Sequence, residues 1–174
     1  MSGRIKMKDK KEIVCFGSDP VEAAVCRYMA EELSKEYEPA DVHIPYVKIA
    51  AVEYPPEENP SAGDKALVYG DFWLENYNIR GDTLECFSNG NYSGAMHVNH
   101  NNEVTEFECV GSCDEFEDSA RKIFGDHYDA FMEVYTNGEG LEERRRETVS
   151  EYVRRNGLRV TKFQDENWDP VELD

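Results

Sequence analysis

The stretch from Lys65 to Val110 constrains the fold most, because it has the pattern of an antiparallel meander. Runs rich in β-branched and aromatic residues at 66–77 and 83–88 flank a turn sequence at 78–82. The glycine-rich segment 89–94 is expected to turn or bulge the third strand, which then resumes at 95–100 and leads into a fourth at 103–110. With a further strand predicted at 42–54, the sequence indicates a four-stranded antiparallel sheet.

Helices are predicted before and after these strands. Asp19 has the position of a helix cap, and apolar residues at helical spacing extend from it to about Lys35. After the strands, one apolar face persists from 116 to 135, with a break or kink expected at Gly125. A last helix is predicted at 141–156, closed by Gly157. The order predicts an α+β domain whose curved antiparallel sheet is covered by helices on one side.

Size and charge limit the classes of partner. The 174 residues suit one domain, so we expect a flexible leader at 1–17 and a single domain at 18–174. The 37 acidic and 19 basic residues give a formal charge of −18, which disfavours nucleic acids and anionic membrane surfaces. The start of the chain lacks the apolar stretch of a secretory signal. Five cysteines without a framework spacing favour free thiols. These features predict a cytoplasmic protein.

An opening amphipathic helix followed by long strands that wrap around it resembles the nuclear-transport-factor-2-like superfamily, whose fold is cystatin-like. The sequence is similar to a group of uncharacterised bacterial members in Val68-Tyr69-Gly70-Asp71-Phe72-Trp73, in the glycine-rich segment 89–94, and in Phe163-Gln164-Asp165 with Trp168-Asp169-Pro170. The resemblance implies a cone-shaped cavity between sheet and helices. The branches of this superfamily include isomerases, dehydratases, hydrolases and binding domains, so the resemblance implies no single activity.

Candidate site residues lie on and beside the second strand. Alternation places Tyr69, Asp71 and Trp73 on one face. If that face lines a cavity, burial among aromatic rings would raise the pKa of Asp71 and suit it to act as a general base, with Tyr69 as a hydrogen-bond donor. Alternatively, Asp71 is a structural acceptor of hydrogen bonds. His97 is either an acid, base or ligand-orienting group, or a packing residue.

Other patterns carry weaker signals. His97 and His100 are expected to point to opposite faces of a strand, and Cys109 and Cys113 have no partners that would complete a zinc site, so no metal or cofactor is predicted. The arginines at 144–146 are expected on a solvated helix face, paired with Glu142. Trp168 is expected to anchor the C-terminal segment to the body of the domain.

Three functions follow from these residues. The first is binding of a small apolar or ring-containing molecule in a pocket lined by Tyr69, Asp71, Trp73, Phe87 and His97. The second is an acid–base enzyme of the isomerase or dehydratase type, with Asp71 as base and Tyr69 or His97 as proton donor. The third is an interaction module that forms a homodimer through an exposed sheet face and binds no ligand.

Overall fold

The computed structural model describes residues 19–56 and 63–174, so the predicted leader at 1–17 lies outside the described residues. Three long strands form the centre of one sheet: β1 (Val42–Glu53), β2 (Asp64–Arg80) and β3 (Thr83–Asn99) pair in antiparallel order, and β4 (Val104–Cys109) pairs with β3. Two short strands from the C-terminal segment lie on the same side of β3 as β4, at the opposite end of that strand. Of these, β5 (Lys162–Gln164) runs parallel to β3, and β6 (Val171–Glu172) pairs with β5. The sheet is therefore mixed, whereas the sequence predicted an antiparallel one.

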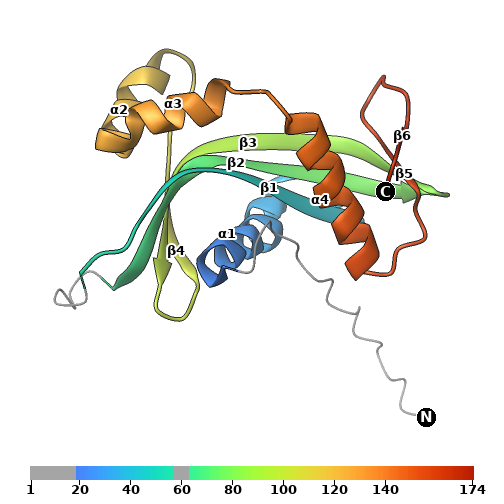
Figure 1. The fold of residues 1–174 in the computed structure, drawn as a ribbon, viewed down its shortest axis with the longest axis horizontal. Coiled ribbons are helices and arrows are strands. Elements are labelled where there is room, and N and C mark those ends of the chain that lie inside the picture. The colour runs from blue at the N-terminus through green and yellow to red at the C-terminus, as the bar shows by residue number, and fades with distance from the viewer. Residues whose placement is uncertain (1–18, 57–62) are drawn as a thin grey trace, which may run out of the picture.

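The helices cover both faces of a strongly curved sheet. Figure 1 shows α1 (Pro20–Glu31) on the concave side, and α2 (Phe116–Phe124), α3 (Tyr128–Thr136) and α4 (Leu141–Arg155) on the convex side. Short 3₁₀ turns at Leu33–Glu36, Cys113–Glu115 and Gly125–His127 join or precede these helices. The prediction of an α+β domain with a curved sheet wrapped around the first helix and covered by later helices is confirmed, whereas the expectation that helices cover one side alone is wrong.

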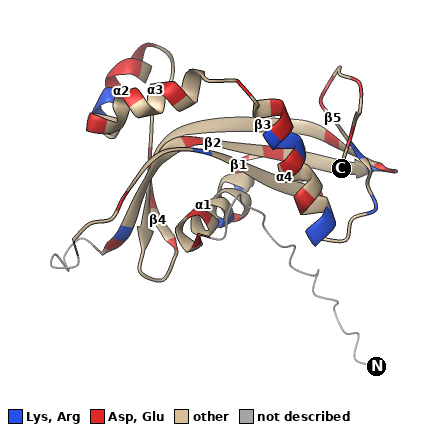
Figure 2. Cartoon of the chain, in the orientation of Figure 1, with Lys and Arg blue, Asp and Glu red and all other residues tan. Residues whose placement is uncertain are grey.

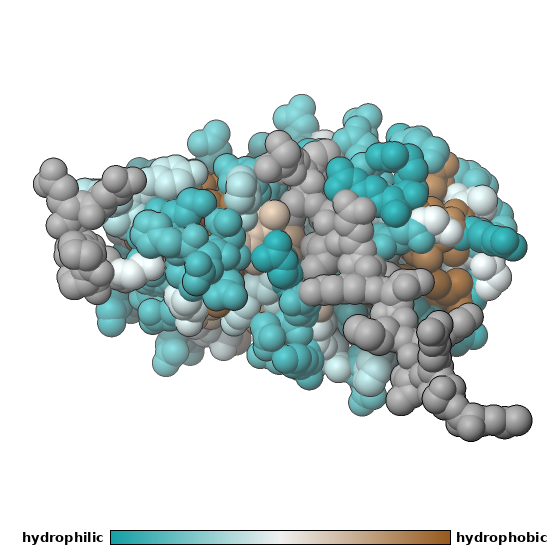
Figure 3. All heavy atoms as spheres, turned by 90° about the horizontal axis from the view of Figure 1, so that it is seen from below, coloured by the Kyte–Doolittle hydropathy of each residue, from teal (hydrophilic) through white to brown (hydrophobic). Residues whose placement is uncertain are grey.

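The concave side is closed by α1. The Asp19 carboxylate accepts a hydrogen bond from the Val21 amide at 2.7 Å, which fixes the start of the helix as predicted. The inward stripe of α1, which includes Val25 and Met29, packs against Phe72 and other apolar residues of the even-numbered face of β2. The surface on this side is mainly hydrophilic, as Figure 3 shows, because the apolar side chains of α1 face the sheet.

The convex side carries two separate apolar clusters. One lies under α2 and α3, where Ala120, Phe124 and Phe131 are buried. The other lies under α4, where Val149 and Tyr152 pack with residues of β1, β2, β3 and β5. Between the clusters, the odd-numbered face of β2 presents polar and aromatic side chains. Gly125, with a φ of 53°, separates α2 from α3 as the sequence predicted.

The glycine-rich segment 89–94 does not turn or bulge the strand, so that prediction is wrong. β3 is continuous from Thr83 to Asn99, and its bulge lies earlier, opposite the step from Asn76 to Tyr77. A Cβ atom on Gly94 would lie 2.0 Å from the Glu108 carbonyl oxygen, and one on Gly90 would lie 1.9 Å from the Tyr37 hydroxyl. These glycines allow close approach of neighbouring elements within an extended strand.

Acidic residues occur on most elements, whereas the basic side chains are most evident on α4 (Figure 2). Within the described ranges, no helix combines the length and the apolar character that crossing a bilayer requires. Cys86, Cys109 and Cys113 carry free thiols, as predicted. Cys26 is disulfide-bonded, so the expectation of a thiol is wrong at that residue.

Candidate functional site

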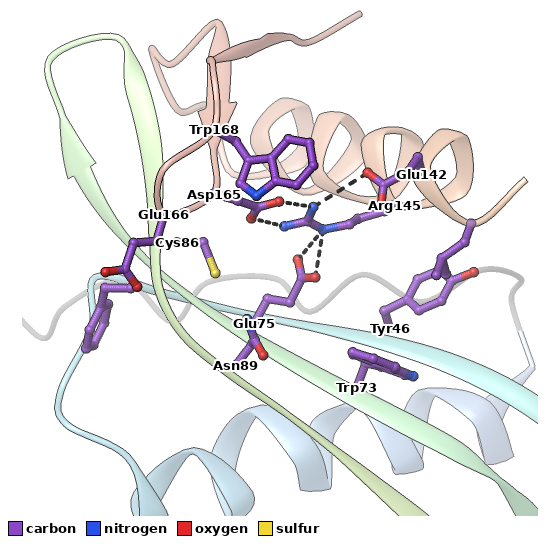
Figure 4. Close-up of a pocket in the computed structure, with 12 residues that line it drawn as sticks. Tyr46, Trp73, Glu75, Cys86, Asn89, Glu142, Arg145, Asp165, Glu166 and Trp168 are labelled. Carbon is purple, nitrogen blue, oxygen red and sulfur yellow. Dashed lines mark hydrogen bonds and ion pairs between the residues drawn. The ribbon is translucent and has the colours of Figure 1, made fainter. Parts of the chain in front are cut away.

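A pocket of about 400 Å³ lies on the convex side, where the first turns of α4 and the segment between β5 and β6 meet the sheet. In Figure 4, Tyr46, Trp73 and Glu75 come from the sheet, Glu142 and Arg145 from α4, and Asp165 and Trp168 from the C-terminal segment. We call it the aromatic pocket, and its lining residues are Tyr46, Trp73, Glu75, Cys86, Phe87, Asn89, Leu141, Glu142, Arg145, Asp165, Glu166 and Trp168.

Arg145 is the centre of an ion-pair network at the base of this pocket. Its Nε atom lies 2.7 and 2.9 Å from the two Glu75 carboxylate oxygens. Its two terminal nitrogens donate to the Asp165 carboxylate at 2.6 and 2.5 Å. One of them also donates to the Tyr77 hydroxyl at 3.2 Å, and Glu142 lies 3.7 Å from the other. Arg145 therefore joins α4, β2 and the C-terminal segment.

Arg145, Glu75 and Tyr77 are buried, which strengthens the electrostatic interactions among them, whereas Asp165 is partly exposed. Only 9% of Arg145 is exposed. Burial alone lowers the pKa of its guanidinium, but the hydrogen bonds of Asp165 and the charge of Glu75 outweigh burial, so the pKa lies above its usual range. Tyr77 is fully buried and hydrogen-bonded to Glu75, and burial raises its pKa well above the usual value. Arg145 therefore remains charged and Tyr77 neutral throughout the physiological pH range.

Aromatic side chains form the walls of the pocket. Tyr46 is buried, whereas Phe87 and Trp168 are 39% and 74% exposed. The Trp73 indole nitrogen donates a hydrogen bond to the Asp71 carboxylate at 2.8 Å, which fixes the orientation of its ring. Trp73 and Trp168 are the two tryptophans of the chain. Both tryptophans therefore report on the same pocket.

Asp71 lies behind the pocket wall and not among the lining residues. It is 0% exposed, and its carboxylate accepts hydrogen bonds from Trp73, from the Ser93 hydroxyl at 2.9 Å and from the Asn91 amide at 3.3 Å. Such a carboxylate satisfies buried donors and orients Trp73. The arrangement fits the structural alternative for Asp71, since a general base must reach its substrate.

Tyr69 and His97 lie further along the sheet. Tyr69 precedes Trp73 by four residues on β2, which is about 13 Å of extended strand, and its ring packs against His127 at 4.8 Å. The Tyr69 hydroxyl donates to Glu53 at 3.5 Å. His97 pairs with Leu67 across the strands, still further from Trp73. The structure thus brings Trp73 and Phe87 together at the pocket, and it separates Tyr69 and His97 from them.

His97 is held between carboxylates. Its Nδ1 atom lies 2.8 Å from Asp64 and its Nε2 atom 2.8 Å from Glu108. Burial lowers the pKa of His97, but the hydrogen bonds with Asp64 and Glu108 outweigh burial, and the net pKa is raised. Because both ring nitrogens donate only in the imidazolium form, this geometry favours the charged ring.

Three features of the pocket escaped the sequence patterns. Arg145 was expected on a solvated face, but it is buried because it shares the inward face of α4 with Thr148, Val149 and Tyr152. Their spacing of three, four and seven residues from Arg145 was the available signal. Trp168 was expected to anchor the C-terminal segment, but it is exposed, and Asp165 and the buried Phe163 make that attachment instead. Tyr46 and Glu75 had no distinguishing pattern beyond alternation in their strands.

The thiol in the pocket is unsuited to act as a nucleophile at neutral pH. Burial, followed by the charge of Glu75, raises the pKa of the Cys86 thiol to about 11, so this pocket residue is a protonated thiol and a weak nucleophile. Among the described residues, no group of three or more His, Cys, Asp and Glu side chains is arranged to hold a metal ion. What the pocket can present to a ligand is therefore its shape, its aromatic surface and its charged side chains.

Comparison with known proteins identified no relative of this chain. No family model, no curated protein and no solved structure matches this chain. The resemblance to the nuclear-transport-factor-2-like superfamily therefore stays a prediction, and function has to be inferred from the pocket itself.

Proposed function

We propose that this protein binds a small, ring-containing molecule in the aromatic pocket. The observation that carries the proposal is the convergence of four aromatic residues, Tyr46, Trp73, Phe87 and Trp168, around a space of about 400 Å³. Pockets for small ligands commonly enclose about 300–1,000 Å³ and combine aromatic walls with a few oriented polar groups. Here the polar groups are supplied by the Arg145 network.

Trp168 is the residue most affected by an occupant. With 74% of its surface exposed, it is the most exposed large hydrophobic side chain in the described part of the chain. A flat ligand ring stacked on it would remove apolar surface from water, and aromatic pairs contribute about 0.5–1.5 kcal/mol beyond that burial. The exposed ring is therefore explained if a ligand covers it.

The proposal retains part of the expectation from the sequence. Small-molecule binding, Trp73 and Phe87 are kept, while the location differs, because this pocket lies between α4 and the convex side of the sheet. Acid–base catalysis by Asp71 would require a ligand to displace the donors that occupy its carboxylate. The homodimer stays a prediction, which light scattering on the purified protein can test separately.

Tryptophan fluorescence tests the proposal directly, since both tryptophans line the pocket. The probes are three phenyl compounds of similar size, phenethyl alcohol, phenethylammonium and hydrocinnamate, titrated with excitation at the red edge of tryptophan absorption. We expect a saturable change with at least one of them. Trp168→Ala should weaken binding about three- to tenfold, read from Trp73, because it removes one stacking surface.

Tyr54→Ala is the matched control, because Tyr54 is 60% exposed and is not among the lining residues. It should bind the probes as the parent does. An unchanged fluorescence with all three probes, or equal losses in Trp168→Ala and Tyr54→Ala, would contradict binding in the aromatic pocket.

A further inference from the structure

We infer that the aromatic pocket selects a cationic ligand, meaning a ring-containing molecule that carries an ammonium or a similar organic cation. The inference rests on the proposed function and adds the charge of the ligand to it. Three observations support it: the balance of charges in the lining, the engagement of Arg145 and the free face of Trp168.

The lining carries more negative than positive charge. Glu75, Glu142, Asp165 and Glu166 contribute four carboxylates, and Arg145 is the single cation among the lining residues. Lys48 and Arg144 lie 5.9 and 6.0 Å from the Trp73 and Tyr46 rings but do not line the pocket, and counting both still leaves an acidic excess. The formal charge of −18 on the whole chain adds a field of the same sign.

Arg145 has little capacity left for an anionic ligand. Its donors already contact Glu75, Asp165 and Tyr77 within 3.2 Å. A ligand carboxylate or phosphate would have to displace one of these acceptors and leave a carboxylate without its partner, which is costly in a buried network. The arginine therefore neutralises the protein's own acids and does not recruit an anion.

The aromatic walls complement a cation. Lys48 and Arg144 already lie near Trp73 and Tyr46, which shows that cations of the protein occupy positions near these rings. No lysine or arginine of the described chain is placed over Trp168, whose ring is open to solvent. A ligand cation over Trp168 would combine cation–π attraction with the nearby carboxylates of the pocket.

The three phenyl probes test the sign of the ligand charge. Phenethylammonium should bind about tenfold more tightly than phenethyl alcohol, as expected for a cation–π contact supported by carboxylates, and hydrocinnamate should bind more weakly than the alcohol. The preference should shrink as salt is added, because exposed carboxylates are screened. Affinities come from tryptophan fluorescence at fixed pH.

Variants of single acidic residues test which carboxylates of the pocket attract the ligand cation. Glu142→Gln and Glu166→Gln, both at exposed positions of the lining, should each lower the affinity for phenethylammonium about two- to fivefold and leave phenethyl alcohol unaffected. Glu143→Gln, also exposed on α4 but outside this lining, is the control and should leave both affinities unchanged.

The outcomes separate this inference from the proposed function. Binding of the alcohol or of hydrocinnamate at least as tight as that of phenethylammonium would overturn the cationic preference and leave ring binding intact. A cationic preference that is the same in Glu142→Gln, Glu166→Gln and Glu143→Gln would also overturn it, since the carboxylates of the lining would then play no part. Absence of binding by every probe would overturn both.

Discussion

Replacing Arg145 with methionine should destabilise the protein strongly. Methionine keeps much of the length of the side chain but removes the guanidinium, so the buried Glu75 loses its cation and Asp165 loses both of its donors. Glu75 is 8% exposed, which leaves little water to replace the lost hydrogen bonds. The C-terminal segment would also lose the ion pair that joins Asp165 to α4.

The magnitude follows from burial. Removing one partner of a buried ion pair costs about 3–5 kcal/mol, because the remaining charge is left uncompensated. For a domain of this size, each kcal/mol shifts the melting temperature by about 2–4 °C, so the expected loss is about 6–20 °C. The Arg145→Met, Glu75→Gln double variant should recover part of this loss, since the two sites are directly coupled.

Urea unfolding followed by circular dichroism measures the free energy difference. Arg144→Met is the matched control: it changes the neighbouring residue, which is exposed and whose guanidinium carbon lies 6.0 Å from the centre of the Tyr46 ring, and it should cost about 1 kcal/mol or less. If Arg145→Met lowers the free energy of unfolding by less than 1 kcal/mol, or by no more than Arg144→Met does, the account of a stabilising buried network is wrong.

Two further predictions concern the rest of the sheet. Because the pKa of His97 is raised from the usual 6.5 by Asp64 and Glu108, its stabilising contribution should be fully present below about pH 6.5 and lost as the pH rises through the raised pKa. After solvent screening this contribution is about 1 kcal/mol or less, and a stability difference between parent and His97→Gln that does not decline with rising pH would contradict it. Asp71→Asn should cost about 1–3 kcal/mol in urea unfolding, because an amide cannot accept from all three donors of that carboxylate. A variant as stable as the parent would show that the network does not need the charged acceptor.

Local patterns sufficed for much of the fold. The cap at Asp19, the break at Gly125 and the stop at Gly157 each depend on a few neighbouring residues, and each appears where the sequence indicated it. The helix termini and most strand boundaries were therefore predictable. The role of Gly94 was not predictable. Glycine is needed there because the Glu108 carbonyl of another strand lies close to it, and no local pattern contains that contact.

The pocket was predictable only in part, for the same physical reason. Alternation along β2 placed Trp73 on the correct face, but nothing local connected it to Trp168, which lies far along the chain in the C-terminal segment. Arg145 fitted two patterns at once, a charged run and an inward helical face. Its burial became clear only from Glu75, which lies 70 residues earlier and supplies the compensating charge.

The pairing of Arg145 with Glu75 and Asp165 has a consequence for how the molecule is made. Contacts between residues far apart in sequence form late, because the intervening chain must first be ordered. During synthesis, α1 and the strands β1 to β4 leave the ribosome well before Asp165 and Trp168 do. A nascent chain that has emerged only as far as β4 would thus hold Glu75 without Arg145, and ligand capture would have to await the emergence of Asp165 and Trp168.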